Sequence, residues 1–470
     1  MRLPSIPLVA GLALAIACAP APAREPVHAL VVPASGVPGV TDAQLDPAFW
    51  VARMGADADR VLLDANAIAA ANARMQATDP SLYDLSALPA SVTKAQANEW
   101  ITDLSSRPSK PLYDEQHRAI PAATIDGLVD ALALDKLADA PLTWALVVQR
   151  ASLRTFPSNL RAFTSDDDTD IDRFQESGVF PGTPVAIVHT SRDGQWAFVV
   201  SQRYRAWIER KFLATGPRDN VLAYATKSPY RLVTGAKIRT VYTPELPKAS
   251  EVLLEMGTRL PLADAKPDVP VNGQHPYTSH IVSLPIRGDD GTLQLAPALV
   301  PKIADTQAAP LPLTRANIVR QGFKFLGERY GWGHDYGDRD CSGFVSEVYA
   351  SLGILLPRNT SDQARSPALR KTRFDDTSTR AQRDTAVAAL DVGDLVYIPG
   401  HVMMVIGRID GQPYVIHDTN GGSILGPDGK RFSLHLNAVS VTPLLPLMYD
   451  QDHRYVDRMT SVVRVAAAPN

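Results

Sequence analysis

The sequence contains very few cysteines. Only Cys18 and Cys341 occur among its 470 residues, and Cys18 lies in an N-terminal segment that we expect to be removed or lipid-modified. We therefore expect no disulfide, even in an oxidising compartment. The stability of the fold must come from hydrophobic cores, which a chain of this length can supply.

The sequence also lacks a large net charge and the spacing of Cys and His residues that is typical of metal-binding motifs. Its formal net charge is -3 and 45% of its residues are hydrophobic, which indicates an ordinary globular chain with room for three or four domains and gives no sign of nucleic-acid binding. His334 lies near Asp338, Asp340 and Cys341. However, no Cys and His pair has structural-zinc spacing and no His-Glu-x-x-His motif occurs, so we expect no metal and no cofactor.

The apolar stretch near the N-terminus, from Leu8 to Ala17, is too short to span a bilayer as a mature helix. The stretch from Leu8 to Ala17 follows Arg2 and suits the core of a signal peptide. Two endings remain open: cleavage after Ala21-Pro22-Ala23, or a lipoprotein box at Ala15-Ile16-Ala17-Cys18 that would attach the chain to a membrane through a lipid on Cys18. Both endings predict a protein outside the cytoplasm, in the periplasm or cell envelope.

The most informative motif is Asp340-Cys341-Ser342-Gly343-Phe344. Behind it, apolar residues recur at helical spacing and Gly353 supplies a stop; they are Phe344, Val345, Val348, Tyr349 and Leu352. Cys341 is thus expected in or next to the first turn of a helix. There, the free N–H groups and the helix dipole favour a thiolate and lower the pKa from about 8.5. A buried structural cysteine is the alternative interpretation.

Two histidines are expected to converge downstream of this cysteine. Residues 395–398, 401–407 and 414–417 read as three short strands, with turns at Pro399-Gly400 and Asp410-Gly411. An antiparallel meander brings His417 near His401. Cys341 as nucleophile, His401 as base and His417 as the orienting third group fit a covalent mechanism, although each histidine taken singly could be an ordinary strand residue.

These residues resemble the NlpC-type bacterial cell-wall cysteine peptidases over roughly residues 311–450. The resemblance rests on the motif at Cys341 together with Tyr330-Gly331-Trp332-Gly333, Pro357-Arg358, Gln363, Gly393-Asp394-Leu395-Val396, His401-Val402-Met403-Met404 and Val415-Ile416-His417. It implies a papain-like α+β domain that hydrolyses the γ-D-glutamyl to diamino acid bond of peptidoglycan stem peptides. It also implies the three roles above and an oxyanion-side hydroxyl at Tyr330. One departure is His334, where the family usually has a second glycine.

The rest of the chain predicts an α+β multidomain protein. Helical patterns begin near Thr41, which has capping-box spacing with Gln44, and continue with a helix from about Asp57 to Gln76 and another capped by Thr93. Short strands with tight turns then resemble two bacterial SH3-like barrels. The expected parts are a signal peptide at 1–23, a helical clip at 24–135, barrels at 136–216 and 217–296, a Pro-rich linker at 297–312 and the peptidase domain at 313–470.

Four further residues are candidates for substrate binding. In enzymes of the resembling family, the first barrel closes one end of the cleft, which points to Tyr204 and Trp207. Polar groups beside the cysteine hold the free amino group of the stem peptide's L-alanine, which points to Asp340 and Ser342. The alternatives are that the aromatic residues belong to the barrel core and that Asp340 caps the helix of Cys341.

The predicted function is that of a monomeric cysteine endopeptidase acting on the γ-D-glutamyl to diaminopimelate bond of stem peptides with a free N-terminal L-alanine. Two other functions stay open: a catalytically weak wall-binding protein that works through its barrels, and an amidase or acyltransferase on the same fold. The sequence leaves open whether the diamino acid is diaminopimelate or lysine.

Overall fold

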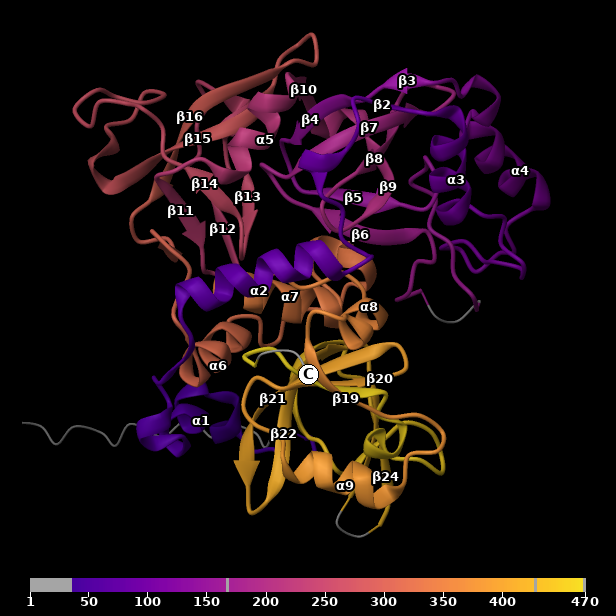
Figure 1. Ribbon diagram of the computed structural model, residues 1–470, viewed down its shortest axis with the longest axis vertical. Helices are drawn as coiled ribbons and strands as arrows, with labels where there is room; N and C mark the ends of the chain where they lie inside the picture. The colour runs from indigo at the N-terminus through magenta and orange to yellow at the C-terminus, as the bar shows by residue number, and fades with distance from the viewer. Residues whose placement is uncertain (1–35, 166–168, 427–428, 468–470) are drawn as a thin grey trace, which may run out of the picture. The chain divides into compact units, whose positions relative to one another are not determined.

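The computed structural model of the chain describes residues 36–165, 169–426 and 429–467 (Figure 1). The predicted leader, with Cys18 and the cleavage site after Ala23, lies outside these residues. None of the helices in the described ranges is long and apolar enough to cross a bilayer.

Short helices dominate the chain up to residue 131. They are a 3-10 helix at Asp42–Leu45, α1 (Pro47–Arg53), α2 (Ala65–Thr78), α3 (Lys94–Leu104) and α4 (Ala122–Ala131). The predicted caps are present: the Thr41 N–H donates to Gln44 Oε1 at 2.8 Å, and Thr93 Oγ1 accepts from the Gln96 N–H at 3.2 Å.

The second predicted helix begins later than its pattern suggests. Residues Val61–Leu63 form strand β1, which pairs with β18 (Leu313–Thr314), and α2 starts only at Ala65. The reason is local, since Asp64 Oδ1 accepts the Ala67 N–H at 2.8 Å and so caps the helix there. The expected start near Asp57 is therefore wrong.

Residues 143–216, called the first β domain, form one antiparallel sheet in the order β10-β4-β7-β8-β9-β5-β6. The strands are β4 (Thr143–Val147), β5 (Ala151–Arg154), β6 (Gln175–Val179), β7 (Pro184–Thr190), β8 (Trp196–Val200), β9 (Arg205–Glu209) and β10 (Leu213–Gly216). All five residues of β8 are buried. One face of the strand contributes to the domain's inner core and the other to a core shared with α3 and α4.

Residues 230–307, called the second β domain, enclose a separate core. Helix α5 (Arg218–Thr226) precedes them, and the strands are β11 (Tyr230–Val233), β12 (Lys237–Arg239), β13 (Leu253–Glu255), β14 (Arg259–Pro261), β15 (Ser279–Arg287), β16 (Leu293–Pro301) and β17 (Thr306–Gln307). They pair as β14-β11-β17, β12-β13 and β15-β16.

The Pro-rich stretch at 297–312 is not a free linker. Its first residues complete β16, which pairs with β15 from Ser279↔Pro301 to Arg287↔Leu293, and Thr306–Gln307 pairs with β11. Prolines are tolerated here because β15 and β16 form a two-stranded sheet in which each strand is an edge. The segment that joins this domain to the next is consequently short.

The C-terminal domain is built on a six-stranded sheet in the order β19-β27-β20-β21-β22-β25. The strands are β19 (Arg370–Arg373), β20 (Leu395–Ile398), β21 (His401–Ile409), β22 (Gln412–Thr419), β25 (Ala438–Pro443) and β27 (Ser461–Arg464). The helices are α6 (Arg315–Phe323), α7 (Cys341–Ser351), α8 (Thr360–Arg365) and α9 (Arg380–Ala388).

Strand β21 shows how this sheet is covered on both faces. Val402, Met404 and Ile406 belong to the core that contains α6 and α7, whereas Met403 and Val405 belong to the core that contains α9. Figure 1 shows α6 and α7 on one side of these strands and α9 on the other. This alternation is the period-2 pattern of a strand whose two faces are both covered. One of the two faces of β21 packs against the core that contains α7.

A smaller sheet in the order β24-β23-β26 flanks the large one, and a two-residue pair, β2 with β3, lies earlier in the chain. The strands are β23 (Gly422–Leu425), β24 (Arg431–Leu434), β26 (Leu447–Met448), β2 (Ser91–Val92) and β3 (Ala140–Pro141). Helices and sheets on several separate cores confirm the predicted α+β multidomain class.

Candidate active site

Cys341 is the first residue of α7. Asp340 is the N-cap, and its Oδ1 accepts the Gly343 N–H at 2.8 Å, which fixes the start of the helix. Phe344, Val345 and Val348 anchor the helix in the core. The cysteine is only 4% exposed, and its sulfur lies 3.6 Å from Thr360 Oγ1.

The thiol of Cys341 is not acidified in the resting protein. Burial raises the pKa of Cys341 to about 12, and the charge of Asp340 acts in the same direction, while hydrogen bonds from Thr360 and the Val402 backbone oppose them. The expected lowering of this pKa at the helix N-terminus is thus wrong, because burial and the charge of Asp340 outweigh the hydrogen bonds that lower the pKa. The predicted role of Cys341 as a nucleophile therefore requires a base that removes its proton.

His401 and His417 lie in direct contact on β21 and β22. His401 Nε2 is 2.8 Å from His417 Nδ1, and His417 Nε2 is 3.0 Å from Thr442 Oγ1 on β25. The three side chains form one chain of hydrogen bonds across neighbouring strands. When His401 Nε2 donates to His417, the Nδ1 atom of His401 keeps its lone pair and can act as a base.

Both histidines are neutral near pH 7. Burial lowers the pKa of His401 to about 4 and lowers the pKa of His417 well below its ordinary value of 6.5. A neutral imidazole accepts a proton, whereas an imidazolium does not. The pair is thus in the state that a general base requires.

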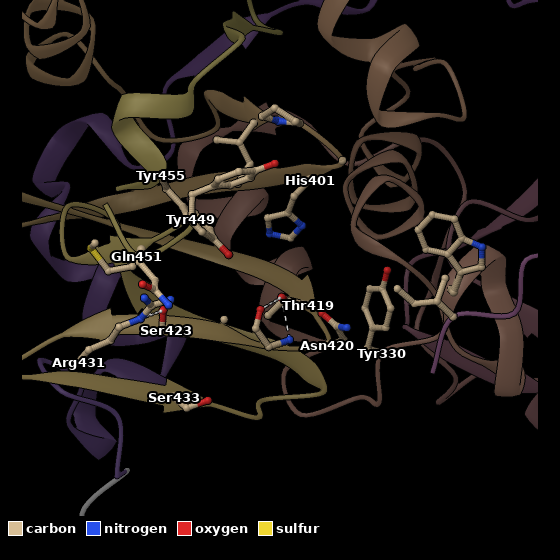
Figure 2. Close-up of a pocket in the computed structure, with 18 residues that line it drawn as sticks. Tyr330, His401, Thr419, Asn420, Ser423, Arg431, Ser433, Tyr449, Gln451 and Tyr455 are labelled. Atoms are coloured by element: carbon tan, nitrogen blue, oxygen red, sulfur yellow. Dashed lines mark hydrogen bonds between the residues drawn. The ribbon is translucent and has the colours of Figure 1, made fainter. Parts of the chain in front are cut away.

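Tyr330 lies on the same hollow as His401. Figure 2 shows its ring across this hollow from Tyr449 and Tyr455, with His401 between them. Burial raises the pKa of Tyr330 well above 10.0, so its hydroxyl stays protonated and is able to donate a hydrogen bond. Its predicted oxyanion role stays a prediction.

Asp340 is already paired with Arg358. The guanidinium Nη2 lies 2.8 Å from Asp340 Oδ2 and Nη1 lies 3.1 Å from Oδ1. Burial by itself raises the pKa of Asp340, but the charge of Arg358 and its hydrogen bonds outweigh burial and bring the pKa to about 2. The prediction that Asp340 holds a substrate ammonium fits poorly, since its charge is matched and it caps the helix.

Ser342 belongs to the same buried cluster. Its Oγ donates to Asp340 Oδ1 at 3.2 Å and accepts from Arg358 Nη1 at 2.9 Å. Arg358 Nε also donates to Ser177 Oγ of the first β domain at 2.7 Å. These bonds connect the residues on either side of Cys341 with that domain.

His334 occupies the position where the resembling family usually has glycine. Its φ of 66° lies in the left-handed region. Two buried hydrogen bonds hold His334 in this conformation. Arg358 Nη2 donates to His334 Nδ1 at 2.8 Å, so the ring proton of His334 is on Nε2. This Nε2–H donates to Glu347 Oε1 at 2.9 Å. Gly343 leaves room for the ring, because a Cβ there would lie 2.4 Å from His334 Cε1.

Arg339, directly before Asp340, is fully buried among three carboxylates. Its Nη2 lies 2.8 Å from Glu255 Oε2 and its Nε 3.0 Å from Glu347 Oε2, and Nη1 contacts Glu328. Glu255 comes from the second β domain and also pairs with Arg150 of the first. Both β domains thus complete the ionic surroundings of the helix start.

Tyr204 and Trp207 have different surroundings. The Tyr204 hydroxyl donates to Glu176, which also accepts from Thr155 Oγ1, and both Tyr204 and Glu176 line a pocket with Cys341. Trp207 is 0% exposed, packs on the core shared with α3 and α4, and donates its Nε1–H to Ser105 Oγ at 3.1 Å. Trp207 is therefore a core residue, and its prediction as a substrate-binding residue is wrong.

Two pockets meet at the candidate nucleophile and base. One, called the Cys341 pocket, is lined by Cys341 but not by His401; the other, called the His401 pocket, is lined by His401 but not by Cys341. The residues that line both are Trp332, Ile398, Pro399 and Gly400. Because these four residues line both pockets, the two pockets are adjacent, with the candidate nucleophile on one and the candidate base on the other.

The sequence did not indicate the roles of three residues of this site: Glu176, Arg358 and Thr442. Glu176 stands in the stretch 172–177 that resembles a barrel, and Arg358 in a motif of the resemblance, but neither pattern indicates a partner near Cys341. Thr442 carries no sequence signal, since a threonine in a strand is ordinary.

Two family models match the chain. The NlpC/P60 family matches residues 327–437, and the SH3 domain (SH3b1 type) matches residues 161–209. These matches confirm the predicted resemblance to the NlpC-type family and the presence of an SH3-like domain.

A curated protein of Bacillus cereus, named gamma-D-glutamyl-L-lysine dipeptidyl-peptidase, is 27% identical over 206 residues, which are 40% of this chain and 54% of that protein. The chain thus spans about half the length of this relative. A solved NlpC/P60 endopeptidase from Photobacterium damselae subsp. piscicida aligns with a TM-score of 0.70 at 16% identity, over 88% of this chain and 96% of its own. That alignment shows a shared fold through most of the chain.

Proposed function

We propose that this chain, whose C-terminal part carries an NlpC/P60 domain, is a cysteine endopeptidase that cleaves the γ-D-glutamyl to diamino acid bond of peptidoglycan stem peptides. The observation that carries the proposal is the arrangement of Cys341 at a helix start, beside the strand that bears His401, with His417 and Thr442 behind it. The predicted leader supports action outside the cytoplasm.

The proposed reaction has two steps. The Cys341 sulfur attacks the γ-carbonyl carbon of D-glutamate while its proton passes to His401, and His401 then protonates the departing amine of the diamino acid. This leaves a thioester on Cys341. Water attacks the thioester, His401 takes a proton from that water, and cleavage of the C–S bond returns the thiol and releases L-Ala-D-Glu.

The Cys341 pocket suits the acyl half of the substrate. Glu176 lines it, and no Lys, Arg or His side chain of the described residues lies within 4.0 Å of the Glu176 carboxylate. This carboxylate, oriented by Tyr204 and Thr155, is available to bind the free ammonium of L-alanine. Because Asp340 is paired with Arg358, Glu176 is the better candidate for selecting peptides with a free N-terminus.

The basic experiment is digestion of purified muropeptides followed by mass spectrometry. We expect new products ending in D-glutamate, and we expect Cys341→Ala to abolish them while retaining a folded protein by circular dichroism. His401→Ala should be nearly as damaging, whereas His417→Gln should keep some rate, since an amide can still orient the imidazole. Cleavage that persists in Cys341→Ala would overturn the assignment of the nucleophile.

The substrate preference needs a second experiment. We expect L-Ala-γ-D-Glu-diaminopimelate to be cleaved at least about tenfold faster than the same peptide acylated on its amine, because Glu176 is half-buried and a charge-assisted hydrogen bond contributes about 1.5 to 3 kcal/mol. Glu176→Gln should remove most of this preference. Glu209→Gln, in the same domain but lining neither pocket, is the matched control. Equal rates for free and acylated peptides would contradict recognition of the N-terminus.

A further inference from the structure

The His401 pocket extends from the candidate base to the small sheet of β23, β24 and β26. Arg431 on β24 lines it, and Arg431 Nε donates to Ser423 Oγ on β23 at 2.7 Å. Figure 2 shows Arg431 and Ser423 beside Gln451, on the side of the pocket away from Tyr330. The bond to Ser423 fixes one edge of the guanidinium, and no other described residue forms a hydrogen bond with its two terminal nitrogens.

The formal charge of the residues that line the His401 pocket is positive. Among the described residues that line it, Arg431 is the one with a formal charge near pH 7, because no Asp, Glu or Lys is present and His401 is neutral. No carboxylate of the described residues lies within 4.0 Å of Arg431. An arginine without a carboxylate partner in a cleft is a ready binding group for an anion.

The position of the pocket identifies which part of a substrate would meet this arginine. The inference rests on the proposed function, in which Cys341 takes the acyl half and His401 protonates the departing amine. The diamino acid must then lie on the side that His401 lines and Cys341 does not, which is the His401 pocket. Its side chain is the part that can extend toward β23 and β24.

We propose that Arg431 binds the carboxylate at the side-chain end of diaminopimelate, so that the enzyme prefers this diamino acid to lysine. Lysine ends in an ammonium alone, which meets no carboxylate among the described residues that line this pocket and is repelled by Arg431. Diaminopimelate ends in a carbon that bears both an ammonium and a carboxylate. The carboxylate pairs with Arg431, while neutral oxygens such as those of Gln451 and Tyr449 are present for the ammonium.

The experiment compares two tripeptides with the wild-type protein: L-Ala-γ-D-Glu-meso-diaminopimelate and L-Ala-γ-D-Glu-L-lysine. Because Arg431 is exposed and therefore screened by water, we expect a preference of about tenfold in kcat/KM, the size of one charge-assisted hydrogen bond. A third tripeptide, whose diaminopimelate is amidated on the side-chain carboxyl group, should lose that preference. This probe tests the proposal without any substitution.

Arg431→Gln should bring the ratio of the two rates close to one, and Arg431→Lys should keep part of the preference. Arg370→Gln is the control, since it removes the same charge from an exposed position on β19 that lines neither pocket. Equal rates for both tripeptides in the wild type, or an unchanged ratio in Arg431→Gln, would overturn the role of Arg431 and leave the proposed function standing. Cleavage of neither tripeptide would overturn the proposed function itself.

Discussion

Replacing Thr442 by valine tests whether the hydrogen-bond chain behind His401 sets the chemistry. Thr442 is 0% exposed, and its Oγ1 is 3.0 Å from His417 Nε2. For His401 Nδ1 to accept the thiol proton, His401 Nε2 must donate to His417 Nδ1. His417 must then carry its own proton on Nε2, where the threonine hydroxyl is the acceptor. Valine has nearly the same shape and removes that acceptor.

The size of the effect follows from one buried hydrogen bond. Without the hydroxyl, the productive tautomer leaves a buried N–H unsatisfied at a cost of about 1 to 3 kcal/mol. Part of this cost is avoided when His417 moves its proton to Nδ1, but His401 then carries its proton on Nδ1 and cannot act as a base. With about 1.4 kcal/mol for each factor of ten, we expect kcat to fall roughly tenfold or more.

The assay measures kcat and KM on the diaminopimelate tripeptide, together with thermal unfolding to verify the fold. KM should change little, because Thr442 lines neither pocket. Thr442→Ser should restore most of kcat, since it restores the hydroxyl. The control is Ser440→Ala: Ser440 pairs with His417 across the strands, but its hydroxyl donates to the Ala438 carbonyl at 3.1 Å.

Loss of the Thr442 hydroxyl should also change the NMR spectrum of His417. The ¹⁵N shifts of His417 should report a proton on Nε2 in the wild type and a shift toward Nδ1 in Thr442→Val. A kcat within about twofold of wild type, with unchanged ¹⁵N shifts, would refute the role of Thr442. An equal loss in Ser440→Ala would show that the strand, and not the hydroxyl, is what matters.

Three other substitutions test the surroundings of the site. Asp418→Asn should raise Tm at pH 8 and leave it unchanged near pH 4. Burial raises the pKa of the Asp418 carboxyl well above 3.8, and neither of its oxygens has a hydrogen-bond partner among the described residues. The stability of the native protein therefore falls as the pH rises above the pKa that this carboxyl has in the unfolded chain. An equal change in Tm at both pH values would count against this. Trp207→Phe should cost about 1 kcal/mol in urea unfolding through loss of the bond to Ser105, and should leave selectivity for free peptides unchanged; altered selectivity would restore Trp207 to the substrate site. Arg339→Met should cost about 3 to 5 kcal/mol in the same assay, because it leaves buried carboxylates uncompensated; an unmoved midpoint would show that the cluster is not stabilising.

Much of the C-terminal fold follows from local sequence signals. The apolar spacing behind Cys341 predicts the helix found at 341–351, and the turns at Pro399-Gly400 and Asp410-Gly411 predict the three strands that carry His401 and His417. These signals work because helix period, strand alternation and turn residues are properties of neighbouring positions. The start of α2 shows their limit, since a capping aspartate and a strand partner from residue 313 decided it.

The sequence by itself determined the candidates for the reactive groups: one thiol at a helix start and two histidines on adjacent strands. The tertiary structure decided their surroundings. It paired Asp340 with Arg358, buried Trp207 in a core, brought Glu176 from the first β domain into the Cys341 pocket and raised the pKa of Cys341. The physical reason is that desolvation and ion pairing depend on which distant segments pack together, and residues far apart in the chain carry no local mark of that contact.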